Sequence, residues 1–185
     1  MTLTGGDHCI GPSNGQLTIN TYVGGLGAKM GHDLVLEAKL WDGTATIDAA
    51  NPAASSVHVR VEVGSLEVIG ATGGLKPLTE NDKADIMQNR DKTLQTAKHP
   101  QIVFDSTGVA GDPPSLAVEG NLTIMGETRQ VTVAVSVDDA GGDTRITGHA
   151  RFLQTDFGVK PYSKLGALKV KDEVEMNVVV TLSSA

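Results

Sequence analysis

Hydrophobic and polar residues alternate along most of this chain with a period of two. Residues 118–124 and 131–137 place valine, leucine, isoleucine or glycine at every second position, with polar residues and alanine between them. Successive side chains of a β-strand point to opposite faces of a sheet. The pattern therefore predicts two strands joined in a hairpin, each with one buried face of small and branched side chains.

The same alternation recurs before and after this hairpin. It predicts further strands over residues 16–23, 32–41, 43–49, 56–69, 100–110, 143–158 and 172–184. Most of the connections are short, so most neighbouring strands are expected to be antiparallel. The total is eight or nine strands, with a short helical turn expected at residues 24–31.

Residues 79–97 lack the alternation. Ala84, Met87 and Leu94 recur at helical spacing, and Thr79 or Asn81 is a suitable N-cap. The segment predicts one substantial helix over residues 80–96, lying across one end of the sheet with these three apolar side chains inward.

Long alternating antiparallel strands leave exposed edges unless the sheet closes on itself. The pattern favours an all-β protein with an eight-stranded antiparallel barrel and one helix packed at its end, and it leaves a two-sheet sandwich open. Residues 1–15 are rich in Gly, Ser and Asn and predict a flexible N-terminal segment. Residues 16–185 are expected to form a single β-barrel domain.

Composition narrows the functional classes. Aromatic residues make up 3% of the chain and glycine occurs 22 times, so an interior wall of small side chains is expected. The formal net charge of −7 argues against binding to nucleic acid or to an anionic membrane surface. Cys9 is the only cysteine, which excludes an intrachain disulfide. No transmembrane run and no signal peptide is recognised, so the chain as written is expected to be cytoplasmic.

Four motifs carry a family resemblance. GNLTIMGETRQVTVAV (120–135), HPQIVFDS (99–106), the Arg90-Asp91 pair and QTDFGV (154–159) occur in this order. Together they resemble the YceI-like family of bacterial polyisoprenoid-binding proteins, over about residues 15–184. The resemblance implies a lipocalin-like barrel whose bore holds a long-chain isoprenoid or similar amphiphile. It also implies a role in transport or stress response and leaves a homodimer open. Family members are often periplasmic or secreted.

Strand parity combined with this resemblance predicts a ligand-binding wall. Its members are apolar residues expected to face the bore, with one histidine at the mouth: Leu34, Leu36, Val59, Phe104, Leu122, Val133, Phe152, Val178 and His32. A neutral imidazole at His32 would hydrogen-bond a ligand headgroup. The alternative for His32 is a structural role in holding the 24–31 turn.

Other candidate chemistry is weak. His8, His58 and His149 lack metal-motif spacing and are expected at the surface. No serine lies in a nucleophile elbow, and residues 24–31 miss the spacing of a phosphate loop. We therefore expect neither an enzyme nor a cofactor or metal site.

Structural roles are expected for two short segments. Phe157 is predicted to plug one barrel end, with Gly158 ending the strand, and Arg90 and Asp91 to tie the helix to that end. A second functional hypothesis is a stress-associated protein that acts through its surface. In that case large inward side chains would fill the bore: Phe104, Phe152, Met176 and Leu182.

Overall fold

A computed structural model describes residues 5–164 and 168–183. The strands are β1 (Gly6–Ile10), β2 (Gly15–Thr21), β3 (Val23–Gly24), β4 (His32–Ala38), β5 (Trp41–Ile47), β6 (Ser56–Glu62), β7 (Leu66–Gly73), β8 (Gln101–Asp112), β9 (Ser115–Ile124), β10 (Glu127–Ala140), β11 (Asp143–Leu153), β12 (Ser163–Lys164), β13 (Leu168–Val170) and β14 (Glu173–Leu182). The helices are α1 (Glu80–Thr93) and the 3-10 turns η1 (Ala28–Met30), η2 (Pro52–Ala54), η3 (Val63–Ser65) and η4 (Gln154–Phe157).

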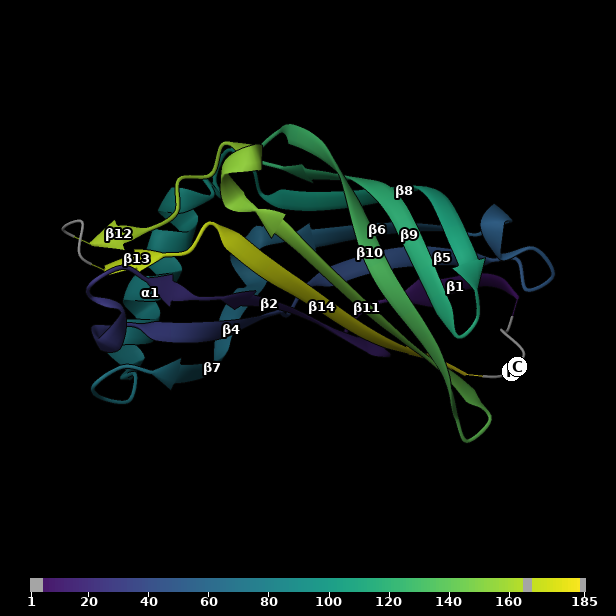
Figure 1. The fold of residues 1–185 in the computed structure, drawn as a ribbon, viewed down its shortest axis with the longest axis horizontal. Helices are drawn as coiled ribbons and strands as arrows, with labels where there is room; N and C mark the ends of the chain where they lie inside the picture. Colours follow the sequence, from purple (N-terminus) through teal and green to yellow (C-terminus); the bar gives the residue numbers. More distant parts are fainter. Residues whose placement is uncertain (1–4, 165–167, 184–185) are drawn as a thin grey trace.

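Eleven strands form one antiparallel sheet in the order β1-β5-β6-β8-β9-β10-β11-β14-β2-β4-β7. This sheet curls around an apolar interior, and α1 lies at one end of the molecule together with the small β12-β13-β3 sheet (Figure 1). The predicted all-β architecture with one α-helix is confirmed for the described residues. The predicted number of eight strands is not confirmed, because eleven take part in the main sheet.

Two bends raise the strand count. β4 and β5 are separated only by Lys39 and Leu40, and β6 and β7 only by η3. The hydroxyl of Ser65 fixes the second bend: it accepts the Leu40 N–H at 3.0 Å and donates to the Glu62 carbonyl at 2.7 Å. The single strand predicted over 56–69 is therefore wrong, since Val63–Ser65 forms a turn in its middle.

The prediction of a flexible segment over residues 1–15 is wrong for Gly6–Ile10, which form β1. This strand pairs with β5, where Ile10 stands opposite Gly43, and Ile10 is buried. A tight turn follows, in which the Gly11 N–H donates to Oδ1 of Asn14 at 3.0 Å. The Gly-, Ser- and Asn-rich composition thus marks a turn between two strands.

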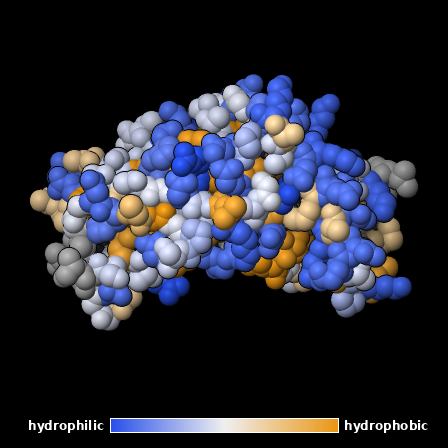
Figure 2. Space-filling model, turned by 180° about the vertical axis from the view of Figure 1, so that it is seen from behind, coloured by the Kyte–Doolittle hydropathy of each residue, from blue (hydrophilic) through white to orange (hydrophobic). Residues whose placement is uncertain are grey.

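Strand parity is confirmed on β6. Val57, Val59 and Val61 point to the interior, while His58 and Arg60 are exposed. Nδ1 of His58 lies 2.6 Å from Oδ1 of Asp105 on the neighbouring strand. Hydrophilic residues accordingly dominate the face seen in Figure 2, where hydrophobic colour is confined to separate patches.

The helix agrees with its prediction at the start and on most of its inner face. Thr79 is the N-cap: its hydroxyl accepts the Asp82 N–H, and the Asp82 carboxylate accepts the Thr79 N–H at 2.8 Å. Met87 and Leu94 pack against the core, but Ala84 is exposed, which corrects its predicted inward position. The helix ends at Thr93 instead of residue 96. In the described part of the chain, no helix is long and apolar enough to cross a membrane.

The segment after β11 closes the end of the sheet that faces α1. β11 stops at Leu153 rather than at residue 158, because η4 turns the chain. Phe157 is only 1% exposed, so the predicted plug is confirmed, and Gly158 adopts the left-handed conformation at φ 69°. Arg90 donates to the Leu66 carbonyl of β7 and pairs with Asp91 at 2.8 Å, which ties the helix to the sheet as predicted. The loop expected after residue 160 contains the short β12 and β13; residues 165–167 lie outside the described residues.

Candidate functional site

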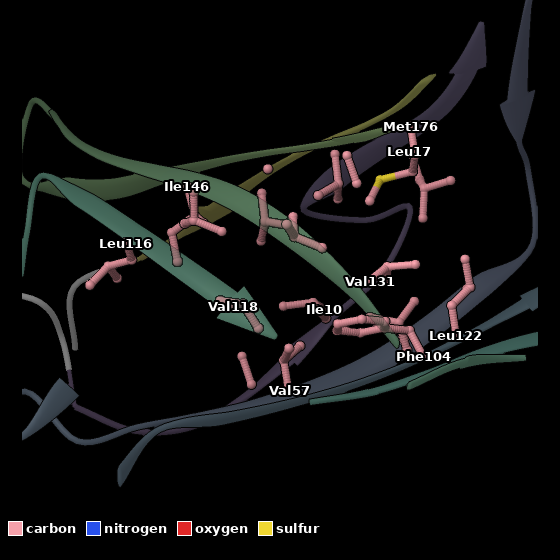
Figure 3. A pocket seen from close by; sticks show the side chains of 18 of the residues that line it. Ile10, Leu17, Val57, Phe104, Leu116, Val118, Leu122, Val131, Ile146 and Met176 are labelled. Atoms are coloured by element: carbon pink, nitrogen blue, oxygen red, sulfur yellow. The ribbon is translucent and has the colours of Figure 1, made fainter. Parts of the chain in front are cut away.

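The interior of the curled sheet holds a cavity of about 230 Å³. Its wall is built by the inward parity of strands that lie far apart in sequence, and Figure 3 shows these side chains converging from opposite walls. The lining residues are Ile10, Leu17, Ile19, Ala45, Thr46, Ile47, Pro52, Ser55, Ser56, Val57, Val59, Val61, Leu66, Ile102, Phe104, Val109, Leu116, Val118, Leu122, Ile124, Val131, Val133, Val135, Val137, Ile146, Gly148, Ala150, Phe152, Met176, Val178, Val180 and Leu182.

Polar atoms are scarce in this wall and confined to one end. Among the described lining side chains none is charged, and only Thr46, Ser55 and Ser56 bear hydroxyls. These three residues flank the β5–β6 connection, which also contains η2. Thr46 and Ser56 are exposed on the outward parity of β5 and β6, so the inward-facing side chains of the cavity are almost entirely apolar.

The end of the cavity toward α1 is sealed. Phe157, Leu122, Ile124 and Val159 form a buried cluster there. The rings of Phe152 and Phe157 meet edge to face, with centroids 5.6 Å apart at 77°, a favourable arrangement for aromatic pairs. Burial of these apolar side chains is expected to stabilise the folded state by several kilocalories per mole.

The opposite end, which we call the open end, is less closely packed, because Ile47, Val109 and Leu116 line the cavity there but are only half-buried. The connections at this end are the β5–β6, β8–β9 and β10–β11 turns (Figure 1).

Two glycines in the cavity wall and next to it allow neighbouring side chains to pack against the backbone. A Cβ on Gly148 would lie 2.8 Å from Cγ1 of Val178 and 3.2 Å from Cγ1 of Val133. On Gly120 it would overlap the ring of Phe104. Glycine in a strand allows such close approach, so the ring and the valines can sit where a side chain would otherwise project.

Six of the nine residues predicted to bind a ligand line the cavity: Val59, Phe104, Leu122, Val133, Phe152 and Val178. Leu34, Leu36 and His32 do not. Leu36 is buried in the core and Leu34 packs against it. Their parity was predicted correctly, but β4 pairs with β7 beside α1, beyond the cavity. Strand parity predicts which face of the sheet a side chain occupies. It does not predict how far along the long axis of the molecule that side chain lies.

His32 binds a loop that precedes the helix. Its Nε2–H donates to the Lys76 carbonyl at 2.8 Å. It therefore lies neither at the cavity mouth nor in a hydrogen bond to the 24–31 turn, the two roles that its sequence position suggested.

Sequence reasoning missed lining residues near the open end. The predicted flexible segment contained Ile10 and the predicted turn contained Ser55, while Ser56 began a predicted strand on its outward parity, so none of the three entered the predicted wall. The strong turn signal of NPAAS (51–55) could have indicated that this connection lies beside the ends of the strands that it joins. The alternative hypothesis of a surface-acting protein expected four large side chains to fill the bore; these four residues line the cavity of about 230 Å³ instead: Phe104, Phe152, Met176 and Leu182.

A polar cluster braces the outer face of the wall. The Tyr22 hydroxyl donates to Oε2 of Glu175 at 2.8 Å, and Arg151 pairs with Oε1 at 2.7 Å. The Tyr22 hydrogen bond is the main cause that lowers the pKa of Glu175, and the same bond raises the pKa of Tyr22. Nearby, His149 bonds Asn177 at 2.9 Å and is half-buried on this outer face. Within the described residues, no group of three or more His, Cys, Asp or Glu could hold a metal ion.

Trp41 lies at the start of β5, opposite Val61. It is 4% exposed and belongs to a core cluster that includes the cavity residues Leu17 and Val180. Its Nε1 has no hydrogen-bond partner among the described residues. The indole thus packs directly behind the cavity wall.

Comparison with known proteins agrees with this geometry. Solved structures with the same fold include BcnA of Burkholderia cenocepacia, with TM-score 0.69 and 18% identity over 91% of this chain and 96% of that one. The Campylobacter jejuni YceI protein has TM-score 0.60 and 15% identity over 84% and 85%.

Curated relatives add sequence similarity. Protein YceI of Escherichia coli O6:H1 is 37% identical over 128 residues, which is 66% of this chain and 61% of the relative. The match thus spans less than two thirds of that relative's length. The family model described as the YceI-like domain matches residues 15–182. Because this match covers most of the chain, the protein belongs to the YceI-like family.

Proposed function

We propose that this protein binds, and carries, a long-chain isoprenoid or a similar amphiphilic lipid in its central cavity. The observation that carries the proposal is the continuous apolar wall, whose described side chains bear no charge and whose hydroxyls stand at one end. Each methylene transferred from water into such a wall contributes about 0.8 kcal/mol. The family relationship supports the same class of ligand.

The connectivity supports a closed bore. When β4 with β5 and β6 with β7 are each counted as one bent strand, these two pair with one another along both halves. The remaining members of the circle are β8, β9, β10, β11, β14 and β2, and β2 pairs with β4. This counting gives a ring of eight, a size that holds one small or slender ligand.

The first test is the lipid content of the protein purified from its own host. Native mass spectrometry and organic extraction should reveal a co-purifying amphiphile with a long hydrocarbon chain. Absence of any such lipid, together with no binding of a long-chain isoprenoid in solution, would exclude the carrier function. A role through the protein surface would then become the leading hypothesis.

The second test narrows the bore. Val133→Trp should abolish binding of a long-chain isoprenoid while the protein stays folded, because a narrow bore cannot hold both a ring and a chain. Overpacking should cost about 1–3 kcal/mol of unfolding free energy. Thr132→Trp is the matched control, since Thr132 is exposed on the same strand. Binding that survives Val133→Trp would contradict the cavity as the site.

A further inference from the structure

Three neighbouring segments lie at the end of the molecule where α1 and the small β12-β13-β3 sheet are found (Figure 1). β13 pairs with β3, and a Cβ on Gly31, just after η1, would overlap the side chain of Leu168 in β13. On the other side of η1, His32 stands opposite Gly73 at the end of β7 and bonds the Lys76 carbonyl. The small sheet, the turn around η1 and the turn after β7 therefore form one continuous surface.

This surface is basic, although the protein as a whole is acidic. We call it the lysine-rich end, and it consists of residues 22–31, 74–76, 161–164 and 168–171. These residues include no aspartate or glutamate and five lysines, all of them exposed: Lys29, Lys76, Lys164, Lys169 and Lys171. The rest of the chain contains all 22 acidic residues and only ten lysines and arginines. The net charge of −7 thus averages two parts of opposite sign.

The five lysines keep their charges available to a partner. Within the described residues, none of them forms an ion pair with an acidic side chain of the protein. Acidic side chains close to this end have other partners: Asp33 accepts the Val23 N–H at 2.8 Å, and Glu80 pairs with Lys83 at 2.8 Å. The lysine-rich end therefore fits an anionic partner.

Exposed apolar side chains lie among these lysines. Leu26 is 103% exposed and Met30 is 59% exposed in the turn around η1, and Leu75 is 75% exposed in the turn after β7. They are three of the six large hydrophobic side chains exposed in the described part of the chain. Lys29 and Lys76 are their sequence neighbours. The partner should accordingly offer apolar contact as well as negative charge.

An anionic lipid bilayer offers both kinds of contact. A lysine close to such a surface raises the affinity about fivefold, and leucine or methionine side chains insert at the boundary between headgroups and acyl chains. The acidic rest of the protein opposes this attraction only weakly. Charges more than about 10 Å apart are largely screened at 0.1 M salt, whereas the 14 residues of β10 alone span roughly 45 Å.

We propose that the lysine-rich end docks the protein on an anionic lipid bilayer, with Leu26, Met30 and Leu75 at the boundary between headgroups and acyl chains. In this orientation the α1 end faces the bilayer and the opposite end of the molecule faces water. The proposal goes beyond the proposed function, because none of these three residues lines the cavity. Lipid binding in the cavity and docking on a membrane can therefore be tested separately.

The test is co-sedimentation of the protein with lipid vesicles at low salt. Vesicles of phosphatidylcholine with about 30% phosphatidylserine are compared with vesicles of phosphatidylcholine alone. The partition coefficient should be at least about tenfold higher for the anionic vesicles and should fall as salt screens the lysines. Equal partitioning onto both kinds of vesicle, or no binding to either, would overturn the proposal and leave the cavity function untouched.

Removal of two lysines locates the electrostatic part. The double variant Lys29→Gln with Lys76→Gln should lower the partition coefficient onto anionic vesicles by about tenfold or more. The matched control is Arg60→Gln with Arg145→Gln, which changes the net charge equally at exposed positions of β6 and β11. An equal loss in the control would assign the binding to net charge and refute a role for this end.

Removal of two leucines distinguishes a bilayer from other polyanions. Leu26→Asn with Leu75→Asn should lower the partition coefficient at least about fivefold, because the side chains no longer insert. Leu40→Asn, at a side chain that is 63% exposed in the β4–β5 bend, is the control and should bind as the unmodified protein does. Unchanged binding of the double leucine variant would identify a general polyanion site, such as one for nucleic acid, and contradict docking on a membrane. Melting curves confirm that each variant is folded.

Discussion

The two ends of the cavity differ in how tightly their side chains are packed. Toward α1, Phe157 and its neighbours are buried and the helix is tied to the sheet through Arg90. At the opposite end, Ile47 and Leu116 of the cavity wall stay half-buried. The difference teaches that the tightly packed part of the interior and its less buried part lie at separate ends of the molecule. Substitutions at the two ends should therefore have opposite consequences.

The largest effect is expected at the sealed end. Phe157→Ala removes a ring that is 1% exposed and leaves a void, which should cost about 3–5 kcal/mol of unfolding free energy. Urea denaturation measures the loss, and Phe157→Leu should recover part of it. A loss below about 1 kcal/mol would contradict the idea that this cluster holds the barrel closed.

The open end should respond in the reverse way. Leu116→Ala removes a half-buried side chain of the cavity wall, so the cost in stability should be only about 1–2 kcal/mol. Affinity for a long-chain isoprenoid should fall several-fold, because the ligand loses apolar contact. Calorimetric titration and denaturation of the same variant separate the two effects. Greater destabilisation than Phe157→Ala would break the comparison.

The helix cap sharpens the comparison further. Thr79→Ala removes the hydroxyl that accepts the Asp82 N–H and should cost about 1 kcal/mol. Because the cap lies away from the cavity, ligand affinity should not change. Thermal melting detects the first effect and calorimetry the second; Thr79→Ser, which keeps the hydroxyl, serves as the control.

The smallest effect on the free energy of unfolding is expected for Glu175 in the polar cluster on the outer face of the wall. This effect depends on pH. The pKa of Glu175 is lowered from its ordinary value of 4.5, mainly by the Tyr22 hydrogen bond. Its carboxylate therefore stabilises the fold above pH 4.5, and this contribution disappears as pH falls through the lowered pKa. Glu175→Gln should cost about 1 kcal/mol or less at pH 7 and progressively less below pH 4.5. Denaturation at several pH values checks this, and an unchanged difference down to pH 3 would contradict it.

Much of the fold could be predicted because period-two alternation follows directly from strand geometry. It identified the inward valines of β6 and β10, and cap chemistry identified Thr79. The bend at Ser65 was missed, because alternation continues up to Val63 and the turn is held by hydrogen bonds from residues distant in sequence. The pairing of β1 was missed for the same reason: Ile10 gains its burial from β5, a long-range contact.

The candidate site was predicted in outline only. Val59, Val133 and Val178 were found because parity gives the face of each residue. His32 and Leu36 were misplaced, because the position of a residue along the barrel axis depends on register between strands, which no local pattern encodes.

Trp41 gives the molecule an optical probe of its own cavity. It is the only tryptophan in the chain, so ultraviolet emission excited at the red edge of the absorption band has a single source. Its indole packs behind Leu17 and Val180, which also face the cavity. Buried indoles emit at shorter wavelengths than hydrated ones, and a ligand that presses on this wall changes the surroundings of the ring. Quenchers dissolved in water should reach it poorly in the folded protein, so the binding of a test ligand to the cavity can be measured in real time without a label.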